Sequence, residues 1–207
     1  MEITETLTEE KKYTTPASEL SLQKTIKSLE NKGIATFVFE TAEEVKKKVF
    51  ELLPEGAEVM DAISMTLKEL GIAKELKGSG KYDSARKKAE SMDKNKKRKT
   101  LWVADYTIGS VHAVTEEGDV LVASHTGSQL ASYAFGSEKV IWVVGTQKIV
   151  KDRDEGIKRI YDYCLPLENE RTMKAYDSPS SVGKILTIAS DKPGRLTLIF
   201  LRENIGF

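Results

Sequence analysis

The chain has 207 residues, enough for one α/β domain with a well-buried core, and its length does not call for a second domain. It carries 32 basic and 32 acidic residues, so no net field attracts it to nucleic acid or to a membrane surface, and neither is expected as a partner. The single cysteine, Cys164, excludes an internal disulfide and any iron–sulfur or zinc site that needs several thiolates of one chain. No cofactor is therefore predicted, and Cys164 is interpreted as a small buried side chain.

The beginning of the chain is polar and acidic, MEITETLTEEKKY, which is unlike a signal peptide. No apolar run approaches the roughly 20 residues that cross a bilayer. We therefore expect a cytoplasmic protein. Residues 1–15 have no apolar periodicity and are predicted to be a flexible segment in front of a single domain over residues 16–207.

Helix and strand signals alternate through the first half of the chain. Thr41 followed by Glu44 is typical of a capping box at a helix start. A polar, basic run from Arg86 through Lys99 is interleaved with acidic residues, which favours a solvated helix face over a nucleic-acid patch. The predicted elements are helices over 17–31, 42–53 and 64–70 and strands over 34–39, 58–63 and 101–105.

A β-hairpin is predicted in the middle of the chain, with strands 110–115 and 120–124 around a turn that contains Gly118. Because side chains alternate along a strand, His112 and Glu116 should share one face. The next turn, 126–129, opens a predicted helix.

An almost continuous apolar strand is predicted over 139–145, typical of a central parallel strand. It ends at Gly145, with Lys148 three residues further on. Ligands of open α/β sheets collect at the carboxyl ends of such strands, so Lys148 is a candidate contact for an anion. A surface lysine is the alternative.

The last third predicts a helix over 152–163, stopped by the sequence 165–171, and then a hairpin of strands 183–190 and 195–202 that completes the sheet. Taken together, the elements predict an α/β fold of three layers, with a mixed, mostly parallel sheet flanked by helices and antiparallel hairpins.

Ser and Thr residues stand at the starts of two predicted helices, and Gly residues lie in the turns beside them. Such residues are usually helix caps, although the same geometry points backbone N–H groups at an anion. We predict a small anionic ligand, a carboxylate or a phosphate. Two histidines without a carboxylate cluster do not support a metal site. The candidate ligand-binding residues are Ser64, Thr66, Thr126, Gly127, Ser128, Gln129, Gly145 and Lys148.

Four motifs resemble the lactate-utilisation (LUD) domain family: AISMTLKELG at 62–71, VHAVTEEGDVLVASHTGSQLASYA at 111–134, VVGTQKIVKD at 143–152 and YCLPLENER at 163–171. They cover most of the chain beyond residue 58. The resemblance implies a NagB/RpiA/CoA-transferase-like fold and a role in the oxidation of lactate to pyruvate beside iron–sulfur partner subunits.

Two further functions remain open. In CoA-transferases of the wider fold a glutamate of a Glu-x-Gly turn attacks the thioester, and Glu116-Glu117-Gly118 resembles that turn, with His112 as an acid or base. A sugar-phosphate isomerase that uses the same glutamate is a variant of this first possibility, and a non-catalytic sensing or assembly subunit is the second. Ile205 and Phe207 at the end of the sequence are predicted to be exposed and to indicate a homodimer.

Overall fold

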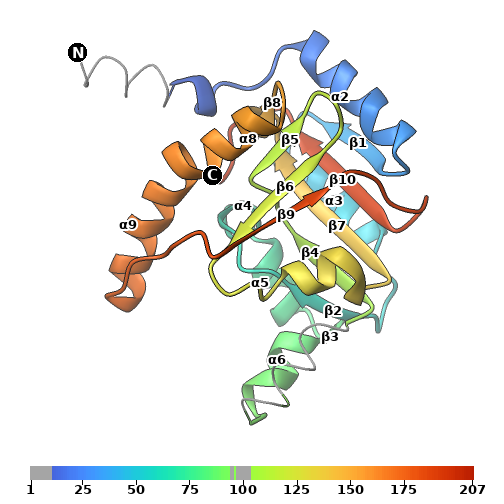
Figure 1. Cartoon of the computed structure of the whole chain (residues 1–207). Helices are drawn as coiled ribbons and strands as arrows, with labels where there is room; N and C mark the ends of the chain where they lie inside the picture. The colour runs from blue at the N-terminus through green and yellow to red at the C-terminus, as the bar shows by residue number, and fades with distance from the viewer. Residues whose placement is uncertain (1–10, 94–95, 97–103) are drawn as a thin grey trace.

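The computed structural model describes residues 11–93, 96 and 104–207, and its main element is a six-stranded sheet in which every neighbouring pair is parallel (Figure 1). In spatial order its strands are β1 (Ala35–Phe39), β10 (Leu196–Leu201), β7 (Lys139–Gly145), β4 (Tyr106–Gly109), β2 (Glu58–Asp61) and β3 (Asp83–Ser84). The α/β class with a mostly parallel sheet, predicted from the sequence, is thus confirmed. No helix in the described ranges is long and apolar enough to cross a membrane.

Strand β7 lies inside the sheet, and its side chains alternate between two separate cores. Ile141 and Val143 pack against helices on one face of the sheet, whereas Val140, Trp142 and Val144 belong to the core on the other face. The run KVIWVVG is apolar throughout because both faces of the strand are covered. The helices of the first face are α3 (Ala42–Glu51), α4 (Met65–Glu69) and α5 (Ile72–Gly78).

A second, four-stranded sheet covers the Trp142 side of the main sheet together with helix α2 (Glu19–Asn31). The predicted hairpin is confirmed there, since β5 and β6 pair antiparallel and Gly118 in their turn has a φ of 82°. The strands of this sheet, in spatial order, are β8 (Ile149–Val150), β5 (Ala113–Thr115), β6 (Val120–Ser124) and β9 (Lys184–Ile188).

The predicted C-terminal hairpin is wrong, because its two strands belong to different sheets. β9 pairs antiparallel with β6, whereas β10 lies between β1 and β7 and is parallel to both. The turn residues 191–194 do redirect the chain, but they lead it from one sheet to the other. Buried Arg195 stabilises this crossing by donating to the main-chain oxygens of Ser132, Tyr133 and Ser137.

The helix predicted to stop after residue 163 continues instead as α8 (Arg153–Arg159), the π-helical turn η3 (Ile160–Cys164) and α9 (Leu165–Tyr176). The N–H of Leu165 reaches back five residues to the carbonyl of Ile160. Pro166 directly follows this π-helical turn, where the regular helical hydrogen-bond ladder is already altered and its missing N–H is accommodated. The proline therefore does not end the helix, and α9 projects from the domain (Figure 1).

The remaining described elements agree with the sequence patterns, apart from three regions named below. Thr41 and Glu44 form the capping box. Most of the strand predicted at 101–105 lies outside the described residues, as do residues 1–10; Tyr13, however, is buried and packs on Tyr163. Ile205 is buried in the core beneath β10, so it is not the exposed apolar residue that was expected. The short elements are α6 (Ala85–Glu90), η1 (Ser132–Gly136) and η2 (Thr146–Lys148).

Candidate functional site

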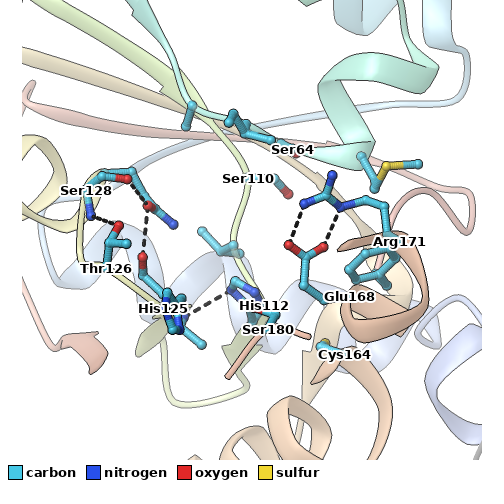
Figure 2. A pocket seen from close by; sticks show the side chains of 18 of the residues that line it. Ser64, Ser110, His112, His125, Thr126, Ser128, Cys164, Glu168, Arg171 and Ser180 are labelled. Carbon is cyan, nitrogen blue, oxygen red and sulfur yellow. Dashed lines mark hydrogen bonds and ion pairs between the residues drawn. The ribbon is translucent and has the colours of Figure 1, made fainter. Parts of the chain in front are cut away.

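A cavity of about 430 Å³ lies at the carboxyl ends of β2 and β4, the edge at which ligands of α/β sheets collect (Figure 2). Several segments far apart in the sequence contribute to its wall. They are residues 60–65 at the end of β2 and beyond it, residues 110–112 between β4 and β5, residues 123–126 and 128–129 at the end of β6 and beyond it, five residues of η3 and α9 between 160 and 171, and residues 180–182 before β9.

Four of the predicted ligand-binding residues line this cavity: Ser64, Thr126, Ser128 and Gln129. Ser64 is also the N-cap of α4, because its Oγ accepts the N–H of Leu67 at 3.4 Å. Thr126 Oγ1 accepts the N–H of Ser128 at 3.3 Å. These side chains therefore form local hydrogen bonds at the helix start and in the turn, and at the same time line the cavity.

Three of the predicted residues are near the cavity without lining it. Thr66 is buried behind the wall. Gly127 has a φ of 83°, which favours glycine and shapes the loop that carries Thr126 and Ser128. Gly145 permits close packing, since a Cβ there would lie 2.1 Å from Gln147 Oε1. Neither glycine presents its own surface to the cavity.

Lys148 lies directly behind the cavity wall and is fully buried. Its Nζ donates to Thr66 Oγ1 at 3.0 Å, to Ser110 Oγ at 3.2 Å and to the main-chain oxygen of Phe207 at 3.1 Å, and none of these partners is an Asp or Glu side chain. Ser110 and Phe207 line the cavity. Burial, with the positive charge of Arg159, lowers the pKa of Lys148 to about 7. The ammonium group is thus costly to hold here without an anion.

A second buried cation, Arg159, adds to this positive region. Its Nη1 donates to the carbonyl of His112 and, at 2.9 Å, to Cys164 Sγ, while its Nε and Nη2 have no hydrogen-bond partner among the described residues. The guanidinium instead lies 5.1 Å from the ring centroid of Tyr163. Cys164 is buried, as predicted, and burial raises the pKa of its thiol.

His112 lines the cavity in a fixed and neutral state. Its Nδ1 accepts the N–H of Ala123 at 3.1 Å, so in the neutral ring the proton is on Nε2. Burial, followed by the charges of Lys148 and Arg159, lowers the pKa of His112 to about 3. At neutral pH the ring is therefore a hydrogen-bond donor through Nε2, which does not suit it to accept a proton there as a general base.

Two arginine–carboxylate pairs flank the cavity, and the sequence patterns did not single them out. Arg86 Nε donates to Asp61 Oδ1 at 3.2 Å, and Arg171 binds Glu168 through two contacts of 2.6 Å. Glu168 and Arg171 are three residues apart on one helix, a recognisable spacing. Asp61 and Arg86 are 25 residues apart, and only the pairing of β2 with β3 brings them together.

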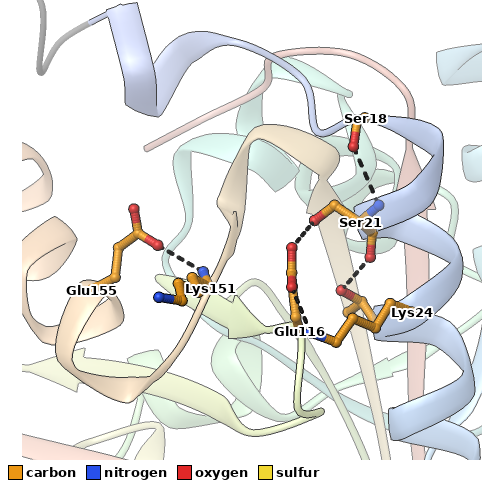
Figure 3. A network of polar contacts seen from close by, with 7 residues as sticks. Ser18, Ser21, Lys24, Glu116, Lys151 and Glu155 are labelled. Carbon is orange, nitrogen blue, oxygen red and sulfur yellow. Dashed lines mark hydrogen bonds and ion pairs between the residues drawn. The ribbon is translucent and has the colours of Figure 1, made fainter.

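Glu116 is not in this cavity (Figure 3). It lies at the tip of the β5–β6 hairpin against α2, where its carboxylate accepts from Ser21 Oγ at 2.7 Å and pairs with Lys24 Nζ at 2.9 Å. Lys24 and Ser21, in that order, lower the pKa of Glu116. The structure thus separates Glu116 from the residues that were expected to assist it as a nucleophile.

The other histidine, His125, also lines the cavity, where its Nδ1 lies 2.8 Å from Ser181 Oγ. Within the described part of the chain no group of three or more histidine, cysteine or acidic side chains is placed to hold a metal ion. The surroundings of the cavity are instead positively charged and rich in hydrogen-bond donors, which suits an anion.

Fold and cavity together define an α/β protein with a polar cavity at the carboxyl ends of parallel strands. A family model described as the LUD domain matches residues 22–201, and the chain belongs to this family. The crystal structure of a DUF162 family protein from Deinococcus radiodurans has the same fold, with a TM-score of 0.55 and 15% identity over 90% of this chain and 99% of that chain.

A second solved structure, eIF2B delta from Chaetomium thermophilum, gives a TM-score of 0.35 at 12% identity, over 68% of this chain and 57% of that one. That similarity is too low to carry an argument. No curated protein sequence matches the chain.

Proposed function

We propose that this LUD-domain protein binds a small organic anion in the cavity and serves the utilisation of lactate or a related organic acid. The observation that carries the proposal is Lys148, a fully buried lysine that has no Asp or Glu side chain among its three hydrogen-bond partners. A carboxylate or phosphate in the cavity would supply the missing negative charge through Ser110.

The charges on the cavity wall support an anionic ligand as well. Asp61 and Glu168 are already engaged by Arg86 and Arg171. Lys68 and Lys77 line the same cavity, although Lys77 lies 3.6 Å from the Asp61 carboxylate. Cations thus outnumber carboxylates among the described side chains of this wall, and their field favours entry of an anion.

The link to lactate follows from the family, whose resemblance implies iron–sulfur partner subunits that carry the electrons. The cytoplasmic location, the partner subunits and the homodimer stay predictions. Co-purification of the protein from its native cell, followed by mass spectrometry and absorption spectroscopy, tests the partners. A preparation that contains no iron–sulfur protein would contradict that part of the proposal.

Titration calorimetry with lactate, pyruvate and inorganic phosphate tests the ligand site. We expect at least one of the three to bind, and Lys148→Met to weaken that binding. Lys47→Met is the matched control, because Lys47 is exposed on α3, away from the cavity. Failure of all three ligands to bind would overturn the proposal. A loss of affinity in Lys47→Met equal to that in Lys148→Met would contradict the assigned site.

No contact favours a CoA-transferase or isomerase reaction through Glu116, because its carboxylate is paired with Lys24 outside the cavity. A sensing or assembly subunit remains compatible with anion binding. Activity assays with the co-purified partners distinguish a catalytic subunit from a sensing one.

A further inference from the structure

A cluster of two hydroxyl groups and one amine lies at the wall of the cavity. Lys148 Nζ lies 3.0 Å from Thr66 Oγ1 and 3.2 Å from Ser110 Oγ, and the two hydroxyl oxygens are 3.3 Å apart. Lys148 and Thr66 are buried, whereas Ser110 is half-buried and lines the cavity (Figure 2). Ser110 is therefore the hydroxyl of this cluster that a molecule in the cavity reaches.

The contacts of Lys148 suit a neutral amine as well as an ammonium group. An amine has two N–H donors and one lone pair, so one of its three contacts must come from a group that donates a proton. The main-chain oxygen of Phe207, 3.1 Å away, is an acceptor only. The proton of Thr66 Oγ1 goes to Ser110 Oγ or to the main-chain oxygen of Ile205. Ser110 is thus the hydroxyl that is left to donate to the lone pair.

The surroundings of Lys148 make its neutral form accessible near neutral pH. Burial, and then the positive charge of Arg159 on α8, lower the pKa of Lys148 to about 7. Cys164 of η3 and Glu69 of α4 act in the opposite direction. His112 also faces Lys148, and burial lowers the pKa of its ring to about 3, so it stays neutral above pH 6. A hydroxyl beside a neutral buried amine is the arrangement of serine nucleophiles that use a lysine as general base.

We propose that Ser110 is a nucleophile for acyl transfer from carboxylic esters, with Lys148 as its general base. Ser110 Oγ attacks the ester carbonyl carbon while its proton passes to Lys148 Nζ. The bond from that carbon to the leaving oxygen then breaks, and Lys148 gives the proton to the departing alcohol. Water repeats the sequence on the acyl-serine, which releases the acid and restores the hydroxyl of Ser110. This activity goes beyond the binding of an anion, and the acid released belongs to the class of ligand proposed for the cavity.

Labelling with an uncharged fluorophosphonate, a probe that phosphonylates activated serines, tests the nucleophile. We expect peptide mass spectrometry to place the label on Ser110, and the protein to hydrolyse para-nitrophenyl acetate. Ser110→Ala should lose both reactions. Ser91→Ala should keep them, because Ser91 is exposed at the end of α6 and does not line the cavity. Absence of the label from Ser110 in the folded protein overturns the inference.

Two substitutions separate the role of Lys148 as a base from its positive charge. Lys148→Met removes the base and should slow labelling by about 100-fold, although the probe has no charge for the lysine to attract. Lys148→Arg keeps a positive charge but supplies no base, so it should slow labelling as much and still bind pyruvate in calorimetry. Circular dichroism checks that both variants fold. Unchanged labelling in a folded Lys148→Arg protein contradicts the assignment of the base.

If neither Lys148 variant folds, the pH dependence of labelling in the unaltered protein answers the same question. The rate should rise about tenfold per pH unit below pH 7 and level off above it, as Lys148 loses its proton. Ser110→Ala, measured in parallel, gives the background reaction of the probe. A rate that is flat, or that rises without levelling, refutes Lys148 as the base. If Ser110 is labelled but no acid binds in calorimetry, the proposed anion site fails and the nucleophile stands.

Discussion

The two ends of the β5–β6 hairpin both carry buried charged groups nearby, but their surroundings differ. At the tip, the buried carboxylate of Asp119 is paired with Lys32 at 2.7 Å and with Arg153 at 2.5 Å. At the opposite end, Lys148 and Arg159 are buried, and neither forms an ion pair with an Asp or Glu side chain among the described residues. A buried charge is costly unless it is paired. The buried carboxylate at the tip has two cationic partners, whereas the two buried cations at the other end have no Asp or Glu partner among the described residues.

Substitution of Lys148 should have the largest effect on ligand binding and tests the difference between the two ends of the hairpin most directly. Lys148→Met removes the charge that the ligand neutralises, so affinity for pyruvate should fall about 100-fold. Because no Asp or Glu side chain of the described residues pairs with the buried ammonium, the free energy of unfolding should stay the same or rise. Calorimetry and urea unfolding measure the two quantities. A marked loss of stability would show that Lys148 is a structural residue.

Asp119→Ala should have the opposite profile. Removing the buried carboxylate leaves Lys32 and Arg153 without their partner, but both are partly exposed, so the free energy of unfolding should fall by about 2 kcal/mol rather than more. Pyruvate affinity of the folded fraction should not change. A drop in affinity at full folding would mean that the two ends of the hairpin are coupled.

The pH dependence of binding is the third test. Burial lowers the pKa of Lys148 to about 7, so above pH 7 the ammonium group of the free protein becomes neutral. The positive charge that attracts an anionic ligand is then lost, and affinity for the ligand should fall by up to about tenfold per pH unit. His112, lowered to a pKa of about 3, and Cys164, with a pKa raised by burial, do not change charge between pH 6 and 8.5.

Pyruvate is the suitable probe of this pH dependence, because its carboxylate keeps its charge over the range. Lys148→Met should bind weakly with no such dependence. A flat profile in the unaltered protein would contradict the role of Lys148.

Glu116→Gln should have the smallest effect. The pair with Lys24 lies at the surface, so its loss should change the free energy of unfolding by about 0.5 kcal/mol. Ligand binding and any activity with partner subunits should be retained. Loss of activity in a stable Glu116→Gln protein would restore the nucleophile hypothesis and show that the tip of the hairpin also has a functional role.

Local patterns determined much of this fold. The apolar run 139–145 predicted a doubly covered central strand, and Thr41 with Glu44 predicted a helix start, because both signals depend only on neighbours along the chain. The same reasoning failed for 183–202, where two good strands with a good turn between them join different sheets. A turn signal specifies a change of direction but not the partner of the next strand.

The sequence by itself determined the class of the fold, the family and most of the polar loop residues at the carboxyl edge of the sheet. Tertiary structure alone decided that Glu116 lies away from them, that Arg86 meets Asp61, and that Lys148 is buried behind Ser110. Burial and pairing depend on which distant segments pack together, and these contacts, rather than residue type, decide whether a buried charge has an ion-pair partner within the fold.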